Sequence, residues 1–216
     1  LKIAEGCDNC CTYCIIPSLR GRYRSRKLEN IVKEAETLAK NGIKEVILVA
    51  QDTTRYGLDL YGEKKLVELI QRISKVDGIE WIRLLYCYPD EIDQKLIDEI
   101  ANNEKVCKYL DIPIQHASDN VLKKMGRRGT AGEIKELIEK LRTRIKGLII
   151  RTTLIVGFPG ETEEDYGILT DFVAENRFDR LGIFMYSKED GTPAGKMQPQ
   201  VPAAVKRARH RKLMKI

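Results

Sequence analysis

The sequence lacks the features that would place the protein in a membrane or outside the cell. No apolar run is long enough to cross a bilayer, no signal peptide is recognisable, and low-complexity stretches are few. Six cysteines in a chain that is 32% charged then predict a reducing, cytoplasmic compartment, where thiols stay free to bind metal. With 216 residues, 43% of them hydrophobic, the chain is long enough for one folded domain with its own core.

The sequence also lacks a large excess of charge of one sign. Its 38 lysines and arginines and 32 acidic residues give a formal net charge of +6. The basic residues gather in two clusters: Arg20, Arg22, Arg24, Arg26 and Lys27, and Lys206, Arg207, Arg209, Arg211, Lys212 and Lys215. Such clusters are a weak signal for RNA or a ribonucleoprotein as a partner, because lysine and arginine displace counterions from phosphates. A solvated surface is the simpler interpretation.

Apolar runs typical of strands alternate with amphipathic stretches typical of helices. The strand candidates are residues 1–5, 45–50, 81–86, 109–114, 148–156 and 180–186, and the helix candidates are 28–40, 64–74, 91–101, 120–125, 131–144 and 163–176. Six strands alternating with helices predict an α/β fold with parallel pairing through right-handed crossovers. We expect a core domain over residues 1–202 and a basic helical segment over 203–216 that leads to a further domain of a longer protein.

Polar or special residues follow every one of the six strand candidates. They are the cysteine loop, Gln51-Asp52, Tyr88-Pro89-Asp90, Gln115-His116, Gly157-Phe158-Pro159-Gly160-Glu161 and Tyr186-Ser187. An open Rossmann-like sheet would concentrate its functional groups at one switch point, whereas a barrel mouth draws them from several strand ends. The pattern therefore favours an incomplete (β/α)6 barrel of TIM-like type.

Cys7, Cys11 and Cys14 have the spacing C-x3-C-x2-C, which supplies three thiolates to one small site. A four-iron cluster takes a thiolate on each iron, so three thiolates leave one iron open for a substrate or cofactor. Cys10 makes a zinc site an alternative, but the two C-x2-C pairs abut without the spacer that structural zinc sites have. A disulfide framework is less favoured still.

The run from Cys7 to Gly21 resembles the cluster motif of radical S-adenosylmethionine (SAM) enzymes, and specifically of the methylthiotransferases. The resemblance covers essentially the whole chain and implies an incomplete six-stranded barrel. It also implies that Cys7, Cys11 and Cys14 hold a 4Fe-4S cluster whose open iron binds SAM, with Cys10 outside the triplet. Reduction by a flavodoxin-type or ferredoxin-type electron donor would then yield a 5′-deoxyadenosyl radical. The same family uses a second 4Fe-4S cluster, which we expect in a preceding domain.

Three strand-end motifs, at residues 50–57, 85–89 and 114–118, resemble the RimO branch of that family. This branch adds a methylthio group to the β-carbon of an aspartate in a small-subunit ribosomal protein, so the resemblance implies that substrate and a possible contact with ribosomal RNA. Modification of tRNA by the same chemistry is the alternative within the family. A non-catalytic, metal-bearing module that binds RNA or the ribosome is the alternative of another class.

Six further residues are candidates for binding the cofactor SAM: Tyr13, Gln51, Gln115, Arg151, Gly157 and Phe158. The polar ones lie in or just beyond expected strands, where a buried polar group needs a partner that either SAM or an internal network can supply. Tyr13 is equally plausible as ordinary packing. The resemblance makes the loop that begins with Gly157 a wall of the adenine site, and a tight turn that needs glycine is the alternative.

No catalytic residue is predicted beyond the cluster ligands. His116 is one of only two histidines. A lone histidine is more often a structural residue than a catalyst, so we expect a structural role for it. Cys87 and Cys107 stand alone, and a small buried hydrophobic residue is the better expectation for Cys87. For Asp52, a role in positioning substrate and a role in capping a turn both remain open.

Overall fold

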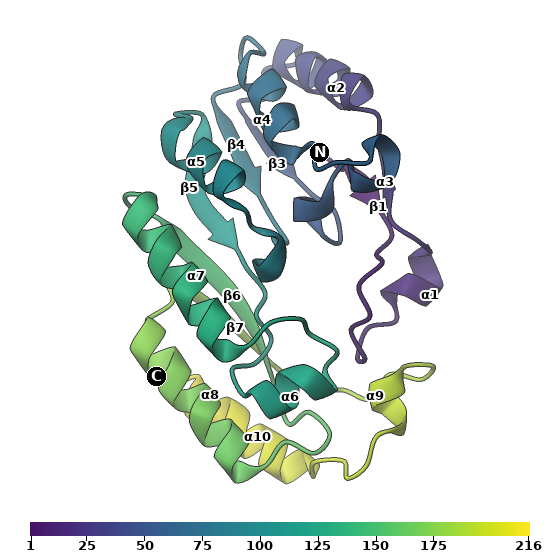
Figure 1. Ribbon diagram of the computed structural model, residues 1–216, viewed down its shortest axis with the longest axis vertical. Helices are drawn as coiled ribbons and strands as arrows, with labels where there is room; N and C mark the ends of the chain where they lie inside the picture. The colour runs from purple at the N-terminus through teal and green to yellow at the C-terminus, as the bar shows by residue number, and fades with distance from the viewer.

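A five-stranded parallel sheet, in the order β3-β4-β5-β6-β7, forms the centre of the protein (Figure 1). The structure is a computed structural model and describes all residues from 1 to 216. The strands are β3 Glu45–Leu48, β4 Trp81–Leu84, β5 Val106–Asp111, β6 Ile149–Val156 and β7 Arg180–Met185. Each pairs in parallel with the next along the chain, as the alternating pattern predicted. Their carboxyl ends therefore lie at one edge of the sheet.

The strand expected at residues 1–5 is only partly formed. Lys2 makes a parallel bridge to Val49 just beyond β3, so the segment lies where a sixth strand would begin. The chain then enters β1 (Ala4–Glu5), which pairs antiparallel with β2 (Arg24–Ser25). Gly6 permits this turn with a φ of +80°, and its missing side chain lets Arg22 approach closely. The cysteine loop occupies the excursion between β1 and β2.

The expected helices form with nearly the predicted bounds: α2 Leu28–Lys40, α4 Leu66–Ser74, α5 Gln94–Asn102, α6 Asp119–Lys124, α7 Ala131–Arg144 and α8 Glu163–Asn176. Thr130 and Thr162 start α7 and α8 with capping boxes, which satisfy the free backbone N–H groups of the first turn. Short elements without a clear periodic signal escaped prediction: α1 Ile16–Arg20, η1 Thr53–Arg55, α3 Leu58–Tyr61, η2 Pro89–Glu91 and α9 Pro193–Lys196. The expected segment at 91–101 begins as η2, so its helix starts later.

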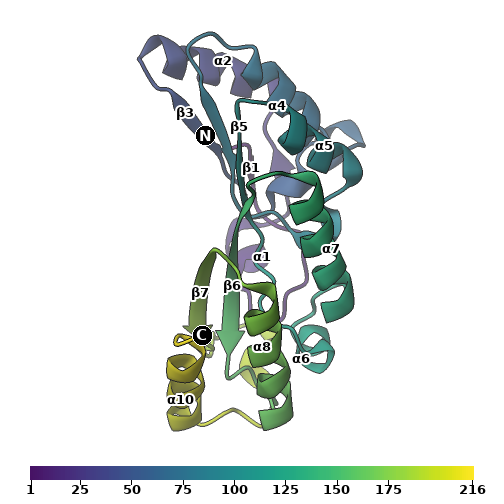
Figure 2. The same ribbon diagram turned by 90° about the vertical axis from the view of Figure 1, so that its left-hand side faces the viewer.

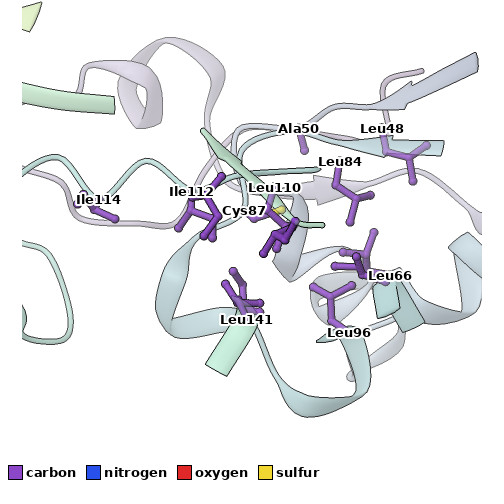
Figure 3. Packing of buried hydrophobic residues seen from close by; sticks show 14 of the residues in the cluster. Leu48, Ala50, Leu66, Leu84, Cys87, Leu96, Leu110, Ile112, Ile114 and Leu141 are labelled. Atoms are coloured by element: carbon purple, nitrogen blue, oxygen red, sulfur yellow. The ribbon is translucent and has the colours of Figure 1, made fainter. Parts of the chain in front are cut away.

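The hydrophobic core lies between the sheet and the helices on one of its faces. In Figure 2, α4, α5, α7 and α8 lie along one side of the sheet. Buried and less buried residues alternate along β6, because successive side chains of a strand point to opposite faces. Figure 3 shows Leu84 and Leu110 of the sheet packing near Leu96 of α5 and Leu141 of α7, and burial of each such side chain stabilises the fold by about 1.5–3 kcal/mol.

The basic stretch at the end of the sequence forms α10 (Ala203–Leu213), which packs against β7 and β6. Leu213 is buried in the main core, and Arg209 is buried beside the loop that follows β6. The helix expected from residue 203 is thus confirmed, and the division into domains at residue 202 stays a prediction. None of the helices has both the length and the apolar character needed to cross a membrane.

Candidate functional site

A pocket of about 510 Å³ opens at the carboxyl ends of the strands. Its volume lies within the range of small-molecule and cofactor sites in proteins. The cysteine loop forms one wall, and residues beyond β3, β4 and β5 form most of the rest. Strand ends along the sheet therefore contribute to a single cavity, which is the arrangement that the polar strand ends predicted for a barrel mouth.

Cys7, Cys11 and Cys14 all line this pocket as free, partly buried thiols, whereas Cys10 is exposed and lies outside it. Burial raises the pKa values of the Cys7 and Cys14 thiols. The backbone N–H of Asn9 donates a hydrogen bond to the sulfur of Cys7 at 3.4 Å. The structure thus separates the three predicted ligands from the fourth cysteine of the same loop.

The three sulfurs do not form a single-ion site. No group of three or more histidine, cysteine or acidic side chains lies as close together as the ligands of one metal ion. A four-iron cluster takes each thiolate on a different iron, so its ligands need not converge on one point. Three soft sulfur donors on one pocket wall fit a cluster of this type.

A buried hydrogen-bond network fixes the shape of the cysteine loop. The side chain of Asn9 donates to Asp52 at 2.9 Å, and the hydroxyl of Tyr23 donates to the Asp52 carbonyl at 2.8 Å. Burial raises the pKa of Asp52, and hydrogen bonds from Thr54 and Asn9 oppose this change. Asp52 does not line the pocket, so its contacts assign it to supporting the loop, a role that neither sequence interpretation had included.

Three of the predicted cofactor-binding residues line the pocket: Tyr13, Gln51 and Gln115. Gln115 has a φ of +72°, which is uncommon for a residue other than glycine and is found at functional sites. Its side-chain oxygen is buried without a hydrogen-bond partner in the protein. Since a buried acceptor without a partner is costly, this oxygen points to a ligand in the pocket.

Arg151, Gly157 and Phe158 are not among the lining residues. Arg151 forms an ion pair with Asp111 at 2.7 Å. Phe158 is fully buried and meets the ring of Tyr13 edge-on, with the ring centroids 6.4 Å apart, so it supports a lining residue from behind. The backbone N–H of Gly157 donates to the carboxylate of Glu161 at 2.7 Å. Their predicted contacts with SAM remain predictions.

His116, Cys87 and Cys107 also lie outside the pocket. His116 is fully buried, and its Nδ1 accepts a hydrogen bond from the N–H of Ser118 at 3.0 Å. Cys87 is buried in the main core, as expected for a small hydrophobic residue, and burial raises its pKa. Cys107 is a partly buried residue of β5. These contacts are structural.

Sequence reasoning missed the polar lining residues Asn9, Tyr86, Arg127 and Thr153, and it named Tyr88 only as a strand-end residue and not as a cofactor contact. Tyr86 and Tyr88 lie in the motif that follows β4, so their position at a strand end was an available signal. Arg127 follows the short helix α6, where nothing in the sequence distinguishes it from the surrounding lysines and arginines. Only the folded structure places it beside Cys11, whose sulfur lies 3.8 Å from its Nη1.

Comparison with protein families finds a match to the Radical SAM superfamily over residues 1–173. A curated protein from Acetivibrio thermocellus, described as ribosomal protein uS12 methylthiotransferase RimO, is 62% identical over 100% of this chain and 48% of its own length. A protein of the same description from Clostridium tetani is 58% identical over 100% of this chain and 49% of its own length. The chain therefore spans about half the length of the curated relatives it matches.

Solved structures share the fold. The radical SAM methyltransferase TsrM from Kitasatospora setae, solved with cobalamin and a 4Fe-4S cluster bound, matches with a TM-score of 0.73 at 24% identity, over 90% of this chain and 38% of that one. Methylornithine synthase (PylB) matches with a TM-score of 0.66 at 16% identity, over 100% of this chain and 61% of that one. At these identities the likeness concerns the fold alone, and it agrees with the predicted fold class.

Proposed function

The chain belongs to the radical SAM superfamily, and we propose that it forms the radical-generating core of a methylthiotransferase. The observation that carries this proposal is the pocket at the strand ends, which is lined both by three free thiols of one loop and by Gln115, whose buried amide oxygen has no partner. Thiols without disulfide partners supply the ligands that an iron–sulfur cluster needs. A buried acceptor in the same cavity supplies a partner for an organic ligand.

Cys7, Cys11 and Cys14 would hold a 4Fe-4S cluster with one open iron. Together with SAM, such a cluster supplies, on reduction, a radical that abstracts hydrogen from an unactivated carbon. The protein's own residues keep the loop in place, because Asn9 is tied to the buried Asp52. Tyr13, backed by Phe158, closes one side of the cavity and helps to exclude water from it.

Gln51 and Gln115 would bind polar groups of SAM, since both side chains line the cavity. Arg151, Gly157 and Phe158 have no position on its wall, so we assign them a supporting role in the same site. Arg151 would act through Asp111, whose carboxylate also accepts the N–H of the lining residue Tyr86 at 3.3 Å. Gly157 and Phe158 would fix the loop behind Tyr13.

We propose an aspartate of a small-subunit ribosomal protein as the substrate of the full-length enzyme. Support comes from the strand-end motifs and from the two RimO relatives, whose names specify ribosomal protein uS12. A second 4Fe-4S cluster would lie in a preceding domain. An electron donor of flavodoxin or ferredoxin type would reduce the cluster, and the exposed Arg207, Arg211 and Lys212 of α10 would face ribosomal RNA. Residues 1–202 would be the core domain and 203–216 the link to a further one.

Anaerobic reconstitution with iron and sulfide tests the core of the proposal. The protein is expected to turn brown, bind about four irons and, after reduction with SAM, release 5′-deoxyadenosine. Replacing Cys7, Cys11 or Cys14 singly by alanine should abolish that release. Cys10→Ala is the matched control, since this exposed thiol of the same loop is no ligand and its loss should change little. A fully loaded protein that leaves SAM intact, or a colourless protein that binds zinc instead, would contradict the proposal.

A further inference from the structure

Arg127 is a partly buried guanidinium that lines the pocket and forms no ion pair with any carboxylate. Several other arginines of the sheet and its loops have an acidic partner, among them Arg83 with Glu45 at 2.6 Å and Arg128 with Asp90 at 2.9 Å. A charge removed from water is costly unless an opposite charge or hydrogen bonds replace the lost hydration. Because Arg127 has no acidic partner, we expect another group beside it to carry the balancing negative charge.

The Arg127 guanidinium has three close neighbours in the protein. Its Nη2 donates to the carbonyl of Pro113 at 2.7 Å, and its carbon lies 3.8 Å from the centroid of the Tyr88 ring. The third neighbour is the sulfur of Cys11, 3.8 Å from Nη1. Tyr88 meets the guanidinium with the face of its ring, so it contributes a cation–π contact and no negative charge. Cys11 is thus the contacting residue that becomes an anion when it binds iron, because a metal ligand cysteine is a thiolate.

The fold holds Arg127 against the cysteine loop. Just before it, Gly126 has a φ of +68°, and a Cβ there would lie only 2.5 Å from the carbonyl oxygen of Cys10. The N–H of Thr12 donates to the carbonyl of Met125 at 2.9 Å, and its hydroxyl donates to that of Lys124 at 2.8 Å. These contacts fasten the segment after α6 to the loop, so the cation is in place before any cluster binds.

We propose that Arg127 is a positioning residue that retains Cys11 as a cluster ligand and raises the reduction potential of the cluster. The inference rests on the proposed function, because it takes the three cysteines as ligands. In its reduction the cluster gains one electron and one negative charge, and no bond forms or breaks. A cation beside a ligand sulfur stabilises the reduced state more than the oxidised state, since potentials depend on net charge and on hydrogen bonds to the sulfurs.

The test is a potentiometric titration of the anaerobically reconstituted chain with dithionite, followed by electron paramagnetic resonance of the reduced cluster, first without SAM. Arg127→Met is expected to lower the equilibrium constant of this one-electron reduction about tenfold, which is about 59 mV for one electron. Arg127→Lys keeps the charge and should recover most of the loss. Arg83→Met is the matched control, because Arg83 also lies over a tyrosine ring, with 5.0 Å to the centroid, but is paired with Glu45 and lies outside the pocket.

An unchanged potential in a fully loaded Arg127→Met protein would overturn the inference. A shift that appears only after SAM is added would overturn it as well, because Arg127 would then act on SAM and not on Cys11. If Arg127→Met fails to retain iron, the iron content of Arg127→Lys and Arg127→Gln is compared. Retention by the lysine variant alone supports the role of charge, and equal loss in both assigns Arg127 a merely structural role. A wild-type chain that binds no cluster contradicts the proposed function itself, which separates the two failures.

Discussion

Arg209 and Arg127 are two arginines removed from water, and they differ in whether a carboxylate of the protein neutralises them. On the side of α10, the buried Arg209 donates to the buried Glu161 at 2.6 Å, and Glu161 also accepts the N–H groups of Gly157 and Phe158. On the side of the cysteine loop, Arg127 has no carboxylate partner and faces Cys11. The charge of Arg209 is neutralised within the protein by Glu161 and Glu163, so we assign this ion pair a structural role. In the proposed function, the charge of Arg127 is balanced only when Cys11 binds the iron–sulfur cluster as a thiolate. We infer that the arginine without a carboxylate partner marks the functional side of the molecule.

Removal of one partner of the Arg209–Glu161 ion pair should cause the largest loss of unfolding free energy. Arg209→Met leaves the Glu161 carboxylate buried without a cation, and loss of one partner of a buried pair costs about 3–5 kcal/mol. Urea unfolding of the cluster-free protein measures it. Arg211→Met, an exposed change on the same helix, should stay within about 0.5 kcal/mol of the wild type. Adding Glu161→Gln to Arg209→Met should restore part of the loss, and no recovery would mean that the pair is not the cause.

Asp165, near the start of α8, should make the stability of the protein depend on pH. Asp165 accepts hydrogen bonds from Ser118, Thr162 and Asn120, and these lower its pKa from 3.8 to about 2 although burial alone would raise it. A lowered folded-state pKa contributes stability above pH 3.8 that is lost as the pH falls through about 2. The contribution is about 2 kcal/mol, of which about half should remain at pH 3.

Comparison of the wild type with Asp165→Asn isolates this carboxylate from the others that titrate in the same range. The stability difference between the two proteins, measured by urea unfolding at pH 6, 4 and 3, should narrow as the pH falls. Asp171→Asn on the exposed face of the same helix serves as the control and should show a constant difference. A gap of constant size for Asp165→Asn would show that hydrogen bonding does not favour its charged form.

Of these changes, removal of the Arg127 guanidinium should have the smallest effect on the unfolding free energy. In the cluster-free protein, Arg127→Met removes a contact with the Tyr88 ring and a hydrogen bond to Pro113, together about 1 kcal/mol, while it also removes a charge without an acidic partner. Urea unfolding should therefore place it well below Arg209→Met. A loss of unfolding free energy as large as that of Arg209→Met would mean that Arg127 is as important for stability as the Arg209–Glu161 pair, and it would contradict the distinction between them.

Much of the fold could be predicted because its signals are local. The helical periodicity of residues 28–40, 131–144 and 163–176 coincides with α2, α7 and α8, and the threonine caps lie within one turn of the residues they serve. The strand at residues 1–5 was less predictable. Its apolar pattern is right for a strand, but Gly6 turns the chain away after a single parallel bridge to Val49.

The candidate site divides in the same way. The cysteine spacing and the glutamines after two strands were visible, because ligand spacing and strand ends can be read from short segments. Asn9 and Asp52 were harder, since their contact joins residues 43 positions apart. Glu161 was named only as part of the loop that follows the fifth strand candidate, and the structure shows its carboxylate accepting two backbone N–H groups of that loop.

The sequence by itself determined the three thiols on one loop, the parallel order of the strands and the edge at which the pocket would form. The tertiary structure decided which charges are neutralised there. Arg127 and Cys11 are 116 positions apart, and Arg209 and Glu161 are 48 apart. Periodicity reports which face of an element is buried, but a pairing between side chains of distant elements depends on how those elements pack. For this reason Arg127 looked like one basic residue among many until the fold placed it beside Cys11.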